Sequence, residues 1–486
     1  MDGAGDARVV VVGGGIAGLL AARVLAEHHL DVRVLDRDQV GGEDPSTPRR
    51  GVPQGRHIHA LLPRGRWILE ELFPGLTGQL VDAGAPFGDL LADARLHLSG
   101  HRFARADADL VTVSVSRPYL EACIRERVAG LANVTVGPPT DVLGLVTAPD
   151  GTRVRGVRVL RRADGSAEEV LDATLVIDAM GRGSRTPAWL RELGYAPPTS
   201  DRIVADLGYA TRHYRLDPDV LGGDWGTLQG PTPTCPRGGA LARIEGDRWT
   251  VTLFGLLGDH PPTDPAGFEA FADSLAFPDL ATAIRSGTPL DHPVAYRFPA
   301  SVRRRYERLG RVPGGLLPIG DAVCSLNPIY GQGMTVAALQ ALALREQVRR
   351  DGTVEPRRWF RRIARIVDAP WDMVVGGDLA HPEVDGPRTA KVRLLGAYIA
   401  RLHAAAAQEP RCAVAFARVM AMVDPPTSLL RPGTVTRVLR GGGRKAPREV
   451  GTHRPGGTDA SRPRRDQTPP RADLGAPRTE PSEEVR

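Results

Sequence analysis

The sequence lacks any long hydrophobic run. No apolar stretch among its 486 residues approaches the ~20 residues that a helix needs to cross a bilayer. We therefore expect no transmembrane segment. The chain passes from Met1-Asp-Gly-Ala-Gly directly into a predicted strand, which indicates no signal peptide and predicts a cytoplasmic protein.

Cysteine is also scarce. The four residues are scattered and show neither CxxC nor metal-ligand spacing, so free thiols in a reducing compartment are expected. His57 and His59 alternate in an extended segment but have no third ligand at a useful spacing, and no metal site is predicted. The cysteines are Cys123, Cys235, Cys324 and Cys412.

Aromatic residues are absent from the C-terminal segment. Residues 441–486 hold ten lysines and arginines against seven acidic residues, and carry half of the formal net charge of +6. A segment rich in glycine, proline and arginine cannot bury enough surface to offset its ordering entropy, and we predict a disordered tail over 431–486. Interspersed acids and the lack of stacking side chains predict no nucleic-acid binding.

A glycine loop between a buried strand and a helix is the first functional motif. It reads Gly13-Gly-Gly-Ile-Ala-Gly18, and Asp36 ends the next strand, 18 residues after Gly18. Gly13 permits a tight turn, Gly15 lets a pyrophosphate approach, and Gly18 lets helix and strand pack closely. Asp36 can accept ribose hydroxyl groups and disfavours a 2′-phosphate. The pattern indicates a dinucleotide other than NADP.

A second glycine-containing stretch lies near residue 320. A short predicted strand ends at Gly320, Asp321 follows, and a helix begins after Gly331 and Gly333. These glycines would let a planar ligand lie against the backbone, where helix N–H groups favour negative charge. This suits a flavin, with Asp321 accepting ribityl hydroxyl groups. The alternative is an ordinary strand-to-helix turn.

The region 195–299 differs in character from the rest. Alternating apolar residues predict antiparallel strands, with a tight hairpin at Glu245-Gly-Asp-Arg248. Trp225, Trp249, Phe254 and Phe268 form either the wall of an apolar pocket or simply the core of this sheet.

These segments together resemble the flavin-dependent monooxygenases of the aromatic-hydroxylase class, which are p-hydroxybenzoate hydroxylase-like. The resemblance covers about residues 6–425. It implies an α/β fold: a Rossmann-like GxGxxG FAD domain with an inserted antiparallel substrate sheet and C-terminal helices. The implied divisions are a discontinuous FAD-binding domain (6–195 and 300–350), a substrate-binding sheet (196–299), a helical region (351–430) and the tail.

The same resemblance assigns cofactor contacts by motif position. The family's Asp-Gly-x-x-Ser motif is only partly present, because Met180 stands where the acid usually is. No catalytic residue is assigned, and His57 and His59 are the candidates for a polar role. The predicted FAD-binding residues are Gly13, Gly15, Ala17, Gly18, Asp36, Arg37, Arg56, Arg117, Val142, Asp321, Pro328, Gly331, Gly333 and Met334.

Three stretches are closest to bacterial polyether-pathway flavin epoxidases. They are Gly51-Val-Pro-Gln-Gly-Arg-His-Ile-His-Ala-Leu, Asp178-Ala-Met-Gly-Arg-Gly-Ser184 and Asn327-Pro-Ile-Tyr-Gly331. The resemblance implies transfer of one oxygen atom from O2, through a flavin C4a-hydroperoxide, to a small hydrophobic natural product, as epoxidation or aromatic hydroxylation. No second GxGxxG is present, so NAD(P)H binds transiently or a separate flavin reductase supplies electrons.

Three other functions stay open at this point. A flavin-dependent halogenase would normally carry a Trp-x-Trp-x-x-Pro motif, which the sequence lacks. An FAD-dependent reductase or dehydrogenase of a prenyl or polyketide chain would share the fold. A non-catalytic flavoprotein adaptor would use the basic tail.

Overall fold

A five-stranded parallel sheet carries the N-terminal glycine loop. The computed structural model describes residues 8–39, 47–232 and 234–441. In the sheet, strand β1 begins at the first described residue and its valines are almost entirely buried. Continuous valine and leucine runs of this kind form strands that are covered on both faces. The strand order is β20 (Leu316–Pro318), β11 (Leu175–Asp178), β1 (Arg8–Val12), β2 (Asp31–Leu35) and β7 (Val134–Val136).

Helices pack on this sheet and on one another. Helix α1 contacts β1, β2 and β11, and it also packs against α4 and α8, so the two glycine-containing stretches lie close together. A three-stranded antiparallel sheet follows residue 140, and it contacts β11 and β2. The helices are α1 (Ile16–Ala26), α2 (Pro63–Leu72), α3 (Leu76–Asp82), α4 (Arg117–Ala129), α5 (Thr186–Glu192), α8 (Gly333–Asp351) and α9 (Pro356–Asp378); the hairpin strands are β8 (Thr140–Thr147), β9 (Val154–Arg161) and β10 (Glu168–Asp172).

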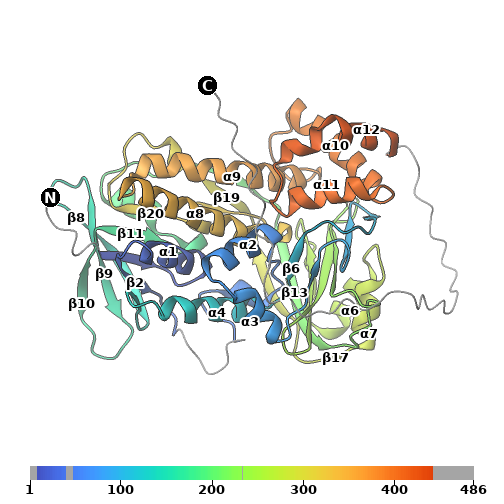
Figure 1. Cartoon of the computed structure of the whole chain (residues 1–486), viewed down its shortest axis with the longest axis horizontal. Helices are drawn as coiled ribbons and strands as arrows, with labels where there is room; N and C mark the ends of the chain where they lie inside the picture. The colour runs from blue at the N-terminus through green and yellow to red at the C-terminus, as the bar shows by residue number, and fades with distance from the viewer. Residues whose placement is uncertain (1–7, 40–46, 233, 442–486) are drawn as a thin grey trace. The chain divides into compact units, whose positions relative to one another are not determined.

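An eight-stranded sheet forms the second layer, at the right of Figure 1. Its centre is antiparallel, and the tight turn predicted at residues 245–248 joins β15 to β16. Short helices α6 (Pro265–Asp273) and α7 (Asp279–Ser286) pack against it. The strands are β17 (Thr288–Pro289), β13 (Leu207–Arg215), β16 (Arg248–Gly255), β15 (Arg237–Ile244), β14 (Gly226–Gln229), β4 (Arg95–Leu98), β5 (His101–Arg102) and β18 (Val294–Phe298).

Two strands of this sheet come from outside the predicted segment 196–299. Strands β4 and β5 lie within 6–195, yet β4 pairs in parallel with β14. Buried Leu96 and His97 make β4 an interior strand that a sheet made from 196–299 alone would lack. Two small sheets complete the fold: β12 (Ser200–Ile203), β19 (Ser301–Arg304) and β21 (Cys324–Ser325), and β3 (Phe87–Asp89) with β6 (Val111–Val113).

Three helices follow α9 and pack together: α10 (Ala390–Ala406), α11 (Pro410–Met420) and α12 (Pro432–Gly441). The predicted tail began at 431, but α12 is helical and its Val438 is buried with Cys412 and Leu402. That apolar contact is what the composition argument missed. The rest of the tail, 442–486, lies outside the described residues. No helix in the described part of the chain is long and apolar enough to span a membrane.

The α/β class predicted from the sequence is confirmed. A parallel sheet with the glycine loop, an additional mostly antiparallel sheet and C-terminal helices are all present.

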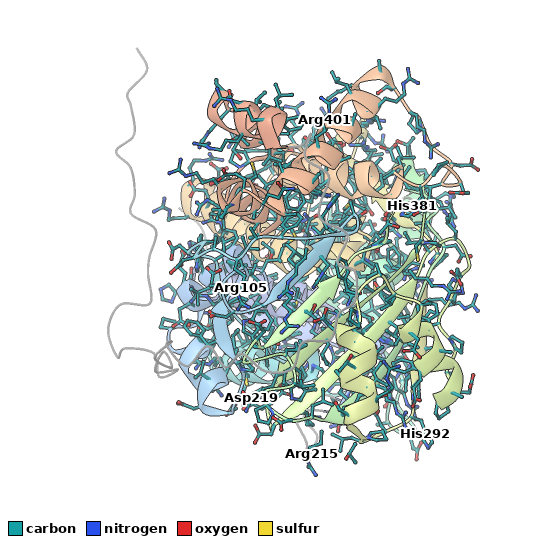
Figure 2. All side chains as sticks on the ribbon, turned by 90° about the vertical axis from the view of Figure 1, so that its right-hand side faces the viewer. Arg105, Arg215, Asp219, His292, His381 and Arg401 are labelled. Atoms are coloured by element: carbon teal, nitrogen blue, oxygen red, sulfur yellow. The ribbon has the colours of Figure 1, made fainter. Side chains whose placement is uncertain are left out.

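Arg95 ties β4 to the neighbouring loop and to α7. Its Nε lies 2.8 Å from Asp224 Oδ2, and its other nitrogens bond Asp279 and the carbonyl of Leu221. Asp224 is 2% exposed and also pairs with Arg105, which Figure 2 shows where the blue N-terminal segment meets the green sheet. The incorporation of β4 therefore depends on a buried charge pair.

We expect Arg95→Met to lower the free energy of unfolding by about 3 kcal/mol, because it removes one partner of a buried pair. Arg105→Met, at a side chain that is 43% exposed, should cost under about 1 kcal/mol. Urea unfolding of both variants measures the two costs. Equal costs would contradict the role given to Arg95.

Candidate functional site

In the N-terminal glycine loop, two glycines leave no room for a side chain and a third, Gly15, faces open space. Gly13 has a φ of +107°, and a Cβ there would lie 2.5 Å from the carbonyl oxygen of Ala179. A Cβ at Gly18 would lie 1.9 Å from the carbonyl oxygen of Gly13. At Gly15, which precedes α1, the nearest atom to an added Cβ is Glu121 Oε2 at 4.0 Å. Gly15 thus faces open space at a helix N-terminus, which favours an anion.

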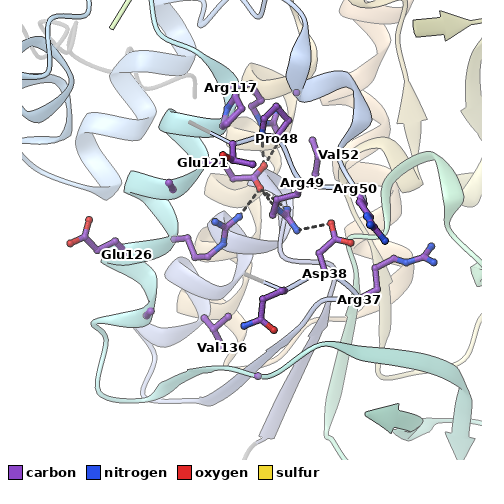
Figure 3. A pocket seen from close by; sticks show the side chains of 18 of the residues that line it. Arg37, Asp38, Pro48, Arg49, Arg50, Val52, Arg117, Glu121, Glu126 and Val136 are labelled. Carbon is purple, nitrogen blue, oxygen red and sulfur yellow. Dashed lines mark hydrogen bonds and ion pairs between the residues drawn. The ribbon is translucent and has the colours of Figure 1, made fainter. Parts of the chain in front are cut away.

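A pocket of about 830 Å³ lies beside this loop (Figure 3). Its volume is in the range of small-molecule sites. Six of its lining residues are arginines, which suits a ligand that carries phosphates. The lining includes Arg37, Asp38, Arg49, Arg50, Val52, Arg117, Glu121, Arg125, Val136 and Arg162.

Glu121 is the centre of charge in this pocket. Its carboxylate pairs with Arg49 (2.5 Å), Arg117 (3.1 Å) and Arg125 (2.7 Å). Burial acts to raise the pKa of this carboxyl group, but the charges of Arg117, Arg49 and Arg125 outweigh burial and hold it below its ordinary value. Glu121 therefore stays ionised and fixes three guanidinium groups in place.

Asp36 lies at the end of β2 as the spacing predicted. Its Oδ2 accepts a hydrogen bond of 2.7 Å from Gly14 N and lies 3.0 Å from Arg49 Nη1. Sequence reasoning missed Arg49, Glu121 and Arg125. The i, i+4 spacing of Arg117, Glu121 and Arg125 along α4 is a signal for two of them. Arg49 lies in a polar loop with no periodicity, so no such signal exists for it.

The second glycine stretch meets the first directly. Gly320 has a φ of +59°, and a Cβ on it would lie 2.8 Å from Ala17 Cβ on α1. Its N–H donates to Gln340 Oε1 of α8 at 2.7 Å. Residues 181–183 and 320–322 form adjoining 3₁₀ turns. Burial raises the pKa of Asp321 above its ordinary value, although Arg117, Arg182 and Arg304 oppose that shift.

The start of α8 is open. Gly331 adopts a φ of +68° and packs closely against Ala60, whereas a Cβ on Gly333 would meet no described atom within 4 Å. Met334, the next residue, is 8% exposed and belongs to the core. The space over Gly333 at a 19-residue helix N-terminus fits the anionic edge of a reduced flavin.

In the partial Asp-Gly-x-x-Ser motif, where Met180 replaces the usual acid, a different acid, Asp178, lies nearby. Asp178 is fully buried, and its carboxylate accepts hydrogen bonds from Ser184 Oγ, Thr186 Oγ1 and Met180 N. The turn that follows β11 is therefore closed by Asp178, two residues before the usual position. Arg182, inside that turn, stacks on Phe298 at 4.5 Å and donates to the Tyr296 hydroxyl at 3.1 Å.

Other predicted contacts lie farther from the pocket. Arg56 is exposed and Val142 is half-buried against the core, and neither is among the pocket-lining residues. Pro328 is exposed at the start of a 3₁₀ turn, Pro328–Tyr330. Cys324 is 2% exposed in β21, as expected for a packed small residue.

His57 connects the loop after Arg56 to the large sheet. Its Nδ1 lies 2.7 Å from Thr211 Oγ1, and its ring stacks on Tyr209 at 5.6 Å. Burial, together with the charges of Arg56 and His213, lowers the pKa of His57 to about 4. Burial also lowers the pKa of His59 to about 3, with Arg117 adding to the shift. Both rings are therefore neutral at pH 7.

The aromatic residues of the sheet divide into two groups. Trp249 of β16 and Phe268 of α6 are buried together where the helices cover the sheet, so they are core. Phe254 instead clusters with Tyr209 and Phe298, and this cluster contacts Ile329 of the turn before Gly331. Of the four aromatics that could form either a pocket wall or the core, only Phe254 lies in the cluster next to the turn before Gly331.

Comparison with known proteins agrees with this arrangement. Residues 8–67 match the family model described as FAD dependent oxidoreductase. The chain is 35% identical to Protein Rv3254 of Mycobacterium tuberculosis over 433 residues, which covers 85% of this chain and 89% of the relative. A flavin-dependent brominase, Bmp2, shares the fold with a TM-score of 0.63 at 15% identity, covering 90% of this chain and 98% of that one. The p-nitrophenol 4-monooxygenase PnpA of Pseudomonas putida gives a TM-score of 0.58 at 16% identity, covering 87% and 98%.

The glycine loop, the arginine-rich pocket and these matches define an FAD-dependent oxidoreductase. The chain belongs to the same family as Protein Rv3254 of Mycobacterium tuberculosis.

Gly333→Val should abolish FAD binding without a matching loss of stability, because the added side chain enters open space where we place the flavin edge. Gly396→Val is the matched control, since Gly396 of α10 also has no described atom within 4 Å of an added Cβ. Valine has a higher helix propensity than glycine, so helix propensity should destabilise neither variant. Equilibrium dialysis and melting temperature measure the two effects. If both variants bind FAD equally well, α8 does not hold the flavin.

Asp321→Ala should weaken FAD binding by about 10- to 150-fold. A charge-assisted hydrogen bond contributes about 1.5–3 kcal/mol, and about 1.4 kcal/mol corresponds to a tenfold change in the dissociation constant. The dissociation constant is measured by fluorescence titration of the apoprotein. An unchanged constant in folded protein would show that Asp321 does not contact the ribityl chain.

His57 should make the protein less stable in acid. Its folded pKa of about 4 lies below the ordinary value of 6.5, so its neutral form is favoured on folding. This contribution is complete above pH 6.5 and is lost as pH falls toward 4. Between pH 7.5 and 5, His57→Gln should remove about 2 kcal/mol of the acid-induced loss in unfolding free energy. The exposed His292→Gln, labelled in Figure 2, should leave that loss unchanged.

Proposed function

We propose that the protein is an FAD-dependent monooxygenase that inserts one oxygen atom from O2 into a small, electron-rich natural product. One observation carries this proposal. The two cofactor stretches meet at Ala17 and Gly320, and the open N-terminus of α8 lies next to an aromatic cluster of the large sheet. A flavin held there would have its ring at the boundary between the two layers.

The residues present fit FAD. Gly14, Gly15 and the helix α1 N-terminus would receive the pyrophosphate, with Arg49 and Arg117 supplying positive charge from the pocket. Asp36 would accept the adenosine ribose and Asp321 the ribityl hydroxyl groups. When bound, the flavin supplies O2 activation and oxygen transfer, which protein side chains cannot perform.

The chain's own contribution is to position the substrate and exclude water. Tyr209, Phe254 and Phe298 present a buried apolar face, and Ile329 joins it to the flavin loop. Neutral His57 lies on the same sheet face, stacked on Tyr209 and tilted against Tyr296. A dry, aromatic site suits a hydrophobic substrate and protects reactive species from hydrolysis.

The resemblance of three stretches to polyether-pathway epoxidases supports alkenes as the first substrate class to test, with aromatic hydroxylation second. Electrons come from NAD(P)H bound transiently or from a separate flavin reductase.

Product mass under ¹⁸O2 tests the proposal. The holoenzyme, reduced with NAD(P)H or with an added flavin reductase, is given a panel of unsaturated and phenolic natural products. A monooxygenase adds one ¹⁸O atom, for a mass gain of about 18. A gain of about 2 with no ¹⁸O would indicate a reductase, and bromination in the presence of bromide would indicate a halogenase. If NAD(P)H is oxidised at the same rate with and without every compound of the panel, an oxygenase function is contradicted.

A further inference from the structure

A buried carboxyl group closes α9 and contacts the flavin loop. Asp378, the last residue of α9, is fully buried. Its Oδ1 accepts a hydrogen bond of 2.9 Å from Asn327 Nδ2 and one of 3.1 Å from the Tyr330 hydroxyl. Its other oxygen, Oδ2, is also buried and has no hydrogen-bond partner among the described residues. A buried carboxyl oxygen without a partner costs free energy, and a catalytic role is one account of such a cost.

The helix is shaped to receive Tyr330. A Cβ on Gly377 would lie 2.0 Å from the Tyr330 hydroxyl oxygen, so a larger residue there would displace the tyrosine. The preceding residue, Gly376, has no described atom within 4 Å of an added Cβ. The close approach of Tyr330 to Asp378 thus depends on one particular glycine of the pair.

The position of this group is at the junction of cofactor and substrate layers. Asn327 and Tyr330 belong to the turn that leads to Gly331 and Gly333. On the sheet side, burial raises the pKa of Tyr209 well above its ordinary value, with the charges of Tyr296 and Asp378 adding to that shift. Ile329, which adjoins Tyr330, packs against the aromatic cluster that we assign to the substrate, so Asp378 lies close to that cluster.

The protonation of Asp378 is balanced near neutral pH. Burial raises the pKa of its carboxyl group to about 7, although the hydrogen bonds from Tyr330 and Asn327 act to lower it. A group whose pKa lies near the working pH is effective in proton transfer. The two donors occupy Oδ1, which leaves Oδ2 as the site for a proton.

We propose that Asp378 is the catalytic base of the substrate site, and that its Oδ2 takes the proton of an acidic substrate hydroxyl group, a phenol or an enol. The substrate O–H bond breaks, an Oδ2–H bond forms, and the electron pair stays on the substrate oxygen. Its negative charge activates the ortho or para carbon of a phenol, or the α-carbon of an enol, toward oxygen transfer. Asn327 and Tyr330 hold Oδ1 meanwhile. This inference rests on the proposed oxygenase function and favours hydroxylation over epoxidation.

Two measurements on the oxidised holoenzyme test the assignment without turnover. The first is difference infrared spectroscopy of the protonated-carboxyl band between pH 5 and 9. The band should disappear as pH rises through about 7 and should be missing in Asp378→Asn. The second is the absorbance of bound 4-nitrophenol and 4-nitro-1-naphthol, whose anions are coloured. Wild-type protein should bind them largely ionised at pH 7, and Asp378→Asn should lower the ionised fraction at least tenfold while affinity for the neutral form changes little.

Matched variants separate this role from a structural one. Tyr330→Phe and Gly377→Ala keep the carboxyl group but remove a hydrogen bond that favours its charged form, so the infrared transition should move to higher pH. Gly376→Ala and Asp372→Asn, at exposed positions of the same helix, should match the wild type in both measurements. Should Asp378→Asn fail to fold, the first pair still decides the question.

Three outcomes would overturn the assignment: an infrared transition unaffected by Tyr330→Phe, wild-type protein that binds the probes only as neutral phenols, or wild-type protein that binds neither probe. Failure of the oxygenase function itself is read separately, from the ¹⁸O content of products.

Discussion

The contact between Gly320 and Ala17 is the constraint on which the cofactor site depends. The two glycine-containing stretches must come within van der Waals distance of each other if both are to contact one ligand. A Cβ on Gly320 would lie 2.8 Å from Ala17 Cβ, and its φ of +59° already disfavours other residues. The same argument applies to Gly18, whose added Cβ would collide with the Gly13 carbonyl. Close backbone packing, rather than any single polar contact, brings the two glycine-containing stretches together.

Charged side chains then favour a ligand that carries phosphates. The positively charged arginines of the pocket repel one another. Glu121 neutralises part of that charge and orients Arg49, Arg117 and Arg125. Asp36 also pairs with Arg49, so the acid that would hold the ribose and the arginine that would approach the phosphates are mutually positioned. Such preorganisation lowers the cost of ordering the site when a ligand binds.

The sequence predicted those features that depend on local rules. The glycine loop, Asp36 and the hairpin at residues 245–248 each follow from turn geometry or strand periodicity, and the structure has all three. The pairing of strand β4 with β14 was missed because it joins residues more than 120 positions apart, and no local pattern encodes that. Arg49 was missed for the same reason: its partners Asp36 and Glu121 become neighbours only through the fold. Trp249 and Phe268 could not be assigned to pocket or core, since periodicity does not say which face of a sheet the helices cover.

Asp378 illustrates this limit most clearly. In the sequence it is one acid near the end of a long helix, and its spacing from exposed Asp372 carries no functional information. Its character arises from three tertiary facts: full burial, two donors on one oxygen, and a glycine at 377 that admits Tyr330. Burial alone would simply keep the carboxyl group neutral, and the two donors alone would keep it ionised. Their opposition sets the group near the neutral point, at the boundary where a flavin and a substrate would meet.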